Sequence, residues 1–111
     1  MKEITDEYMY SMFPTTKEYT IVLLKPGNNS DHPEAKKLIW EHGRRNFALR
    51  AEGILSIVCP VTVEASLSGL GIFKTDVEET KKLMDADPAV EAGIFIYEVY
   101  PCKSFPGDSL P

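Results

Sequence analysis

The chain has few of the residues that cross-link a small fold or hold a metal: its 111 residues include two cysteines and two histidines. Cys59 and Cys102 stand far apart, outside the clustered Cys/His patterns of zinc sites. We expect both to be buried free thiols. A metal or haem site built around His32 and His42 would need carboxylates as further ligands, so we expect no metal and no cofactor.

Positive charge and long apolar runs are also scarce. Twelve Lys and Arg stand against 17 Asp and Glu, and no basic run is longer than Lys36-Lys37 or Arg44-Arg45. This pattern gives no electrostatic footprint for nucleic acid or an anionic membrane. No stretch approaches the roughly 20 apolar residues of a spanning helix, and the acidic residues near Met1 do not fit a signal peptide. We expect a cytoplasmic protein with neither nucleic-acid nor membrane partners.

The remaining pattern predicts one domain. A chain of this length buries roughly two thirds of its unfolded surface, enough for a core without disulfides. Apolar and β-branched runs predict strands, and periodic segments between them predict helices. The order is βαββαβ, typical of an α+β, ferredoxin-like fold with a four-stranded antiparallel sheet and two helices on one face. The predicted strands are 18–25, 54–59, 66–73 and 93–100, the helices 33–51 and 77–86, with an arm at 1–17, the domain at 18–101 and a tail at 102–111.

Local signals set the expected ends of these elements. Asp31 or His32 is expected to cap the first helix, with Pro33 in its first turn and Gly53 as its stop. Thr75 or Asp76 is expected to cap the second helix. Asp87-Pro88 should end that helix, and Pro101 should close the last strand.

Both faces of the predicted sheet are largely apolar. On the first strand Tyr19, Ile21 and Leu23 alternate with Thr20, Val22 and Leu24, so each face needs a cover. The helices cover one face, and a second copy of the chain is the economical cover for the other. We therefore expect a homodimer through the sheet face. The aromatic N-terminal segment Tyr8 to Phe13 is the competing cover, unless it forms only a partly ordered arm.

Two titratable residues in apolar settings are candidates for chemistry. His42 lies on a helical stripe with Asn46 that faces the sheet, and Asp87 opens the segment after the second helix. A histidine beside a carboxylate is a minimal unit for proton transfer near neutral pH. Each also has a structural interpretation, as a hydrogen-bonded core histidine and as a turn residue before proline. Arg45 lies near the stripe and either holds an anionic substrate or belongs to a solvated flank with Arg44 and Arg50.

Ordered motifs across residues 18–101 resemble the YCII-related (YciI-like) family, which is similar in fold to the dimeric α+β barrels. The resemblance implies that His42 and Asp87 form an active-site pair, although most of that family has no assigned reaction. This chain departs from the family pattern at Cys59-Pro60, where Gly-Pro is usual, and at Ala89, where a bulkier residue is usual. The matching residues are 23–27, His42, 53–55, Pro60, 69–73, 86–88, 92–93 and 97–99.

The expected function is general acid–base catalysis, an isomerisation or elimination on a small organic substrate. His42 and Asp87 would be catalytic, with Arg45, Asn46 and Tyr97 binding substrate. Gly69-x-Gly71 lies within a strand and is no phosphate cradle, so the reaction needs no cofactor. The alternative is a non-catalytic dimer that binds a small molecule or a protein; it predicts a dry, fully hydrogen-bonded His42 with no solvent path from Asp87. Tyr97 is then a packing residue.

Overall fold

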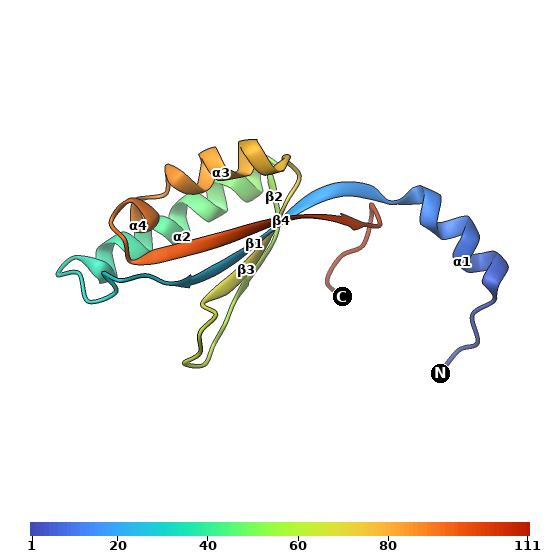
Figure 1. Cartoon of the computed structure of the whole chain (residues 1–111), viewed down its shortest axis with the longest axis horizontal. Helices are drawn as coiled ribbons and strands as arrows, with labels where there is room; N and C mark the ends of the chain where they lie inside the picture. Colours follow the sequence, from blue (N-terminus) through green and yellow to red (C-terminus); the bar gives the residue numbers. More distant parts are fainter.

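The computed structural model describes residues 1–111 and contains one antiparallel sheet with helices on one face (Figure 1). The strand order is β2-β3-β1-β4, which places β2 and β4 at the two edges. This arrangement confirms the predicted α+β, ferredoxin-like βαββαβ fold. The strands are β1 (Lys17–Pro26), β2 (Leu55–Pro60), β3 (Gly69–Phe73) and β4 (Phe95–Ser104), and the helices are α1 (Asp6–Met12), η1 (Phe13–Thr15), α2 (Ala35–Ala51), α3 (Val77–Asp85) and α4 (Pro88–Glu91).

The start of α2 differs from the prediction. The helix begins at Ala35 after Glu34, and neither Asp31 nor His32 caps it. Instead, the ring Nδ1 of His32 accepts the backbone N–H of Glu34 within the turns that precede the helix. The predicted end is confirmed, because α2 stops at Ala51 and Gly53 takes a positive φ of 75°.

The segment around Asp87 contains a short helix that the sequence reading missed. Asp76 caps α3 as expected, accepting the backbone N–H of Glu79. Pro88 does end α3, but it also begins α4 with Asp87 as its N-cap. Proline suits the first helical position because its missing N–H would have no partner there.

The last strand runs past Pro101, where we had expected it to end. β4 pairs with β1 as far as Ser104, opposite Lys17, and Pro101 lies opposite Thr20. β4 is an edge strand, so a residue without an N–H is tolerated on its outer side. The β1–β4 ribbon therefore extends beyond β2 and β3 (Figure 1).

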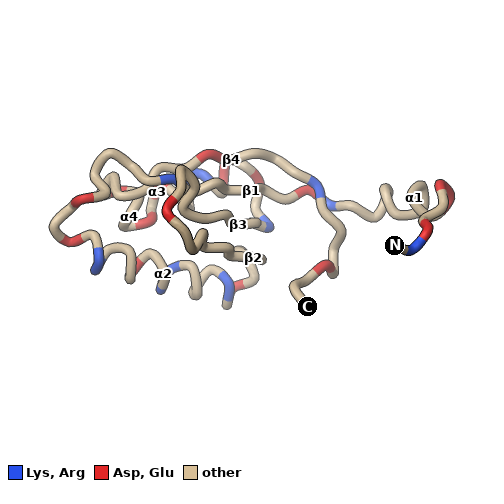
Figure 2. Tube along the Cα trace, turned by 90° about the horizontal axis from the view of Figure 1, so that it is seen from below, with Lys and Arg blue, Asp and Glu red and all other residues tan.

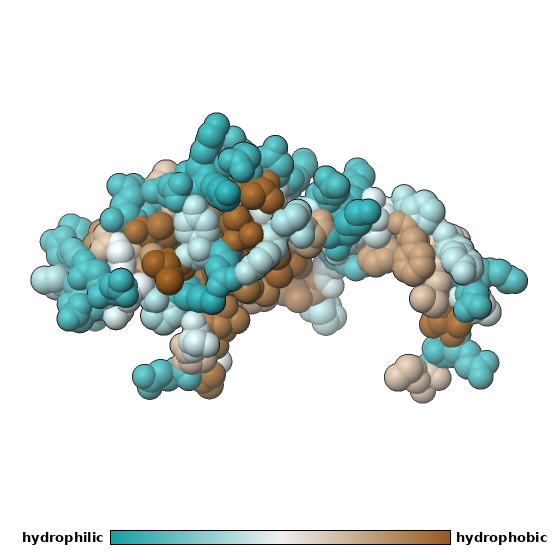
Figure 3. Space-filling view, viewed as in Figure 1, coloured by the Kyte–Doolittle hydropathy of each residue, from teal (hydrophilic) through white to brown (hydrophobic).

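The core lies between the helices and the sheet. It is formed by Val22, Leu49, Leu55, Phe73 and Met84. The other face keeps its apolar residues half-exposed, including Ile57, Leu70 and Ile72. β2 and β3 carry no charged residue, as Figure 2 shows from that side, and Figure 3 shows apolar surface along the sheet. The face of the sheet without helices is apolar as predicted, except for a polar cluster on its β4 side. In this cluster Lys25 and Tyr100 donate hydrogen bonds to the carboxylate of Glu98.

Of the two alternatives for the N-terminal segment, the structure shows an arm and not a cover: α1 has no buried residue and projects from the end of the β1–β4 ribbon (Figure 1). The expectation of two buried thiols is corrected. Both cysteines are free as expected, but Cys59 is exposed because it lies on the edge strand β2, and Cys102 is half-buried. None of the helices has the length and apolar character needed to traverse a bilayer.

Candidate active site

Asp87 is held rigidly by the start of α4. Its Oδ1 atom accepts the backbone N–H groups of Ala89, at 2.9 Å, and Val90, at 3.4 Å. The side chain is 1% exposed, so the carboxylate is removed from water. These two bonds use one carboxylate oxygen and leave Oδ2 free to face α2.

His42 on α2 meets that second oxygen. Its Nδ1 atom lies 2.7 Å from Oδ2 of Asp87. The imidazole side chain is 13% exposed, and its ring packs on Phe95 of β4 with 5.2 Å between centroids and a 54° tilt. The aromatic contact and the hydrogen bond together fix the ring orientation, which a proton-transferring histidine requires.

The surroundings of Asp87 keep it ionised. Burial acts to raise the pKa of its carboxyl, but the hydrogen bond and charge of His42 and the backbone N–H groups of Ala89 and Val90 outweigh burial, and the pKa is lowered. Arg45 adds positive charge, with Nη1 4.0 Å from Oδ2. That Nη1 atom is buried and has no hydrogen-bond partner.

An ionised carboxylate only accepts hydrogen bonds, so Nδ1 of a neutral His42 must carry the proton. The other ring nitrogen, Nε2, then has a free lone pair. Nδ2 of Asn46 lies 3.3 Å from Nε2 and donates to it, one turn along α2. The arrangement presents Nε2 as the basic atom of the site, with the amide of Asn46 in front of it.

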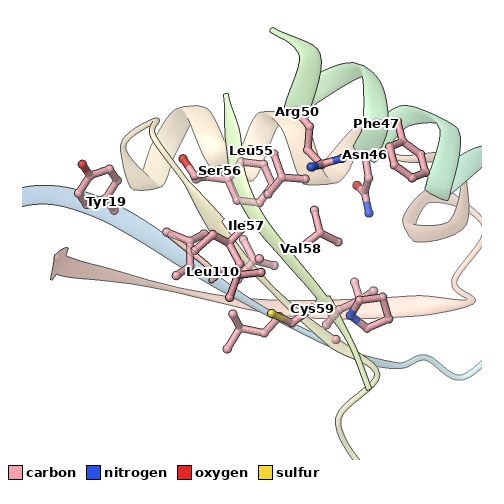
Figure 4. Close-up of a pocket in the computed structure, with 18 of the residues that line it drawn as sticks. Tyr19, Asn46, Phe47, Arg50, Leu55, Ser56, Ile57, Val58, Cys59 and Leu110 are labelled. Atoms are coloured by element: carbon pink, nitrogen blue, oxygen red, sulfur yellow. The ribbon is translucent and has the colours of Figure 1, made fainter. Parts of the chain in front are cut away.

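His42 and Asn46 line a cleft of about 840 Å³, whereas Asp87 lies behind the imidazole and does not reach it. The cleft follows the edge strand β2, with Asn46, Phe47 and Arg50 of α2 on one side of the strand (Figure 4). Ile57, Cys59 and Leu110 lie toward its other side. The lining is mostly apolar, so the cleft suits a small organic molecule with few polar groups.

The structure does not bring two of the predicted substrate-binding residues into this cleft. Arg45 faces Asp87 instead. The Tyr97 hydroxyl donates to Oδ1 of Asp85 at 2.6 Å, which ties β4 to α3. Burial, and then the hydrogen bond and charge of Asp85, raise the pKa of Tyr97 to about 12. Tyr97 thus has a structural role, in which its hydroxyl group links β4 to α3.

Two site residues were missed. Arg50 was assigned to a solvated flank, yet it lines the cleft and stacks over the Phe47 ring at 5.6 Å. Phe95 was read only as a strand residue, yet its ring packs on His42. Arg50 lies two turns beyond His42 on α2, a spacing that indicates a shared side of the helix. No local signal indicates the contact of Phe95, which depends on how β4 pairs with β1.

No three His, Cys, Asp or Glu side chains come together as a metal site would require. Comparison with known proteins gives a likeness in structure alone. No protein-family model and no curated protein matches the chain. Among solved structures the chain is similar to the 5-chloro-2-hydroxyhydroquinone dehydrochlorinase (TftG) of Burkholderia phenoliruptrix AC1100, in complex with 2,5-dihydroxybenzoquinone. The TM-score is 0.53 and the identity 13%, over 74% of this chain and 90% of that one. At this identity the likeness shows a shared fold.

Proposed function

We propose that this chain is a YCII-related enzyme that uses His42 and Asp87 for general acid–base chemistry on a small organic substrate. The observation that carries the proposal is the 2.7 Å contact between Nδ1 of His42 and Oδ2 of Asp87 at the wall of the cleft. A buried, ionised carboxylate behind a cleft-lining imidazole orients the ring and stabilises its charged form.

In the proposed reaction, Nε2 of His42 removes a proton from a carbon next to a carbonyl group. The C–H electron pair forms a double bond, and the imidazolium is stabilised by Asp87. In an isomerisation the proton returns to another atom of the substrate. In an elimination a leaving group departs with its electron pair as the double bond forms. Such a base contributes about 10²–10⁴-fold to the rate.

We favour elimination or isomerisation on a hydroxylated ring. The neighbouring structure is that of a dehydrochlorinase with a dihydroxybenzoquinone bound, and the apolar cleft here suits a flat ring. Asn46 would yield Nε2 to the substrate and bind one of its oxygens. Arg50 would hold a phenolate or enolate oxygen. Arg45 would stabilise the negative charge of Asp87 and would not bind the substrate.

We further propose a homodimer through the open sheet face. The half-exposed residues Ile57, Leu70 and Ile72 lie opposite the helix-covered face and need a cover. A two-fold axis would place two such faces together. The cleft extends along β2 toward this face, so a partner would close its open side.

The second candidate is a binding module without chemistry, and one observation favours it. Both ring nitrogens of His42 already have partners, Asp87 and Asn46, as expected of a satisfied structural histidine. In that case the cleft holds an apolar ligand and the imidazole only shapes its wall.

The test uses NMR to monitor the exchange of substrate protons for deuterium in D₂O. The candidate substrates are chlorinated and unchlorinated hydroxyquinones and 2-oxo acids. The wild type should exchange a proton next to an oxygen-bearing carbon, and His42→Gln should lose about 10²–10⁴-fold of that rate. His32→Gln is the matched control, because His32 lies in the loop before α2 and outside the cleft. Tight binding of a ring without exchange or turnover would select the binding module.

A further inference from the structure

Helix α1 has no support within its own chain. It has seven residues, none of them buried, and the element it contacts most is the adjoining turn η1. Isolated helices shorter than about 12 residues are marginal in water, so a helix like α1 needs a surface to pack on. The exposed residues Tyr8, Met9 and Phe13 make that need stronger.

Residues 8–13 have one wholly apolar side. Tyr8, Met9, Met12 and Phe13 follow the i, i+1, i+4, i+5 spacing of one helical stripe, and Glu7, Ser11 and the exposed Tyr10 lie on the other side. Asp6 and Glu7 occupy the first turn, and the last turn has no basic residue. The helix is therefore acidic in its first turn, as the red positions of α1 show (Figure 2), and aromatic in sequence.

A second apolar surface, with positive instead of negative charges beside it, lies on α2. A groove there has Ile39, Trp40 and Phe47 as its apolar residues, with Lys36 and Arg44 beside them. Trp40 is 70% exposed and Phe47 67% exposed, which is unusual for large aromatic side chains. This surface is called here the α2 groove. Ile39, Gly43 and Phe47 also line the neighbouring cleft of His42, whereas Lys36, Trp40 and Arg44 do not.

Gly43 lies in the middle of the α2 groove. A glycine inside a helix is costly relative to alanine, and nothing in this chain requires one, because a Cβ at Gly43 would meet no atom within 4 Å. Such a position lets another helix approach the α2 backbone closely. The glycine thus marks a crossing point for a helix that the chain's own fold does not supply.

We propose that α1 of one copy docks in the α2 groove of a second copy, in a reciprocal exchange of arms. The acidic first turn of α1 complements Lys36, and beside it Arg44, which also pairs with Glu41 of its own helix at 3.1 Å. Two α2 grooves facing each other would instead juxtapose those like charges, which disfavours that pairing. The chain's own α1 is held away from its α2, because residues 17–20 pair with 101–104 in the extended ribbon (Figure 1).

Trp40 is the sole tryptophan, so its fluorescence reports directly on the groove. In the wild type, raising the protein concentration should shift its emission to the blue and reduce its quenching by acrylamide. Glu7→Lys, which reverses a charge of the arm, and Gly43→Leu, which fills the crossing point, should each abolish both changes. Ser11→Lys is the matched control, because it adds the same side chain away from the apolar stripe, leaves the acidic first turn intact and should keep them.

Two further measurements make the result decisive. A mixture of Glu7→Lys with Lys36→Glu should regain shielding of Trp40 that neither variant shows alone. Ile72→Lys, on the opposite face of the sheet, removes the sheet-face dimer of the proposed function and should leave the shielding in place. The proposal fails if Trp40 is equally quenched at every concentration, if the arm variants leave its shielding unchanged, or if the mixture recovers nothing.

Discussion

The Nδ1 atom of His42 lies 2.7 Å from Oδ2 of Asp87, although the two residues are 45 positions apart in the chain. The contact joins the middle of α2 to the N-cap residue of α4. It couples a group that lines the cleft to one that is fully enclosed, so its consequences can be measured in tautomer, stability and activity.

Asp87→Asn should reverse the tautomer of His42. The amide oxygen would keep the bonds to the N–H groups of α4, which turns the amide nitrogen toward His42. Nδ1 must then accept, and the proton moves to Nε2. The ¹⁵N shifts of the two ring nitrogens should exchange in a heteronuclear NMR spectrum, and unchanged shifts would mean that Asp87 does not set the tautomer. Proton exchange on substrate should fall with the loss of a basic Nε2.

Stability should fall in acid because of Asp87. The pKa of its carboxyl is lowered from 3.8, so the ionised form stabilises the folded chain. That contribution is complete above the unfolded-state pKa and is lost as the pH falls through the folded-state pKa. Urea unfolding of the wild type and Asp87→Asn should therefore differ at pH 6 and converge toward pH 2. A constant difference across this range would rule out Asp87 as the titrating group.

Tyr97→Phe should weaken the fold and spare the chemistry. The substitution removes the hydrogen bond to Asp85 and should cost about 0.5–1.5 kcal/mol in the free energy of unfolding. Tyr97 lies outside the cleft, so substrate affinity and turnover should stay within about twofold of wild type. A large rise in KM with unchanged stability would show that Tyr97 binds the substrate.

Two glycines should respond oppositely to alanine. A Cβ at Gly27 would lie 2.2 Å from the carbonyl oxygen of Gly93, where the loop after β1 is tied to the start of β4. Gly27→Ala should destabilise the fold by about 1–3 kcal/mol. Gly43→Ala meets open space and should stabilise α2 by up to about 1 kcal/mol in a dilute monomer. Denaturant unfolding of both variants at low concentration makes the comparison.

Ile72→Lys should dissociate a dimer formed through the open sheet face. Ile72 lies opposite Ile57 in the β2–β3 pair, so the charge would enter the middle of the apolar surface. Val63→Lys, at an exposed position between β2 and β3, carries the same charge outside it. With Glu7→Lys added to both, so that no arm exchange can hold two copies together, sedimentation equilibrium should give a monomer for the first variant and a dimer for the second. A dimer in both would place the interface elsewhere.

The fold was predictable because its signals are local. Each strand contains an apolar, β-branched run, and β1 and β2 end at proline. The stop at Gly53 and the cap at Asp76 were read correctly. The predictions were wrong where the tertiary structure outweighs the local preference of proline to end a strand or a helix. Pro101 continues β4 because its outer side has no partner, and α4 forms because Pro88 can begin a helix as well as end one.

The candidate pair was predictable in its residues but not in its surroundings. The stripe on α2 and the Asp-Pro motif indicate His42 and Asp87 separately. The contacts of Phe95, Arg45 and Tyr97 depend on the register of β4 and the angle between helices, which no local pattern encodes.

The sequence by itself determined the order of strands and helices, the apolar character of both sheet faces and the two candidate residues, because these depend on neighbours within a few positions. Only the tertiary structure decided that a hydrogen bond joins His42 to Asp87, that Tyr97 turns to Asp85, and that the N-terminal helix lies apart from the body. Those outcomes depend on distances between residues that are far apart in the chain, and such distances are set by packing and strand register.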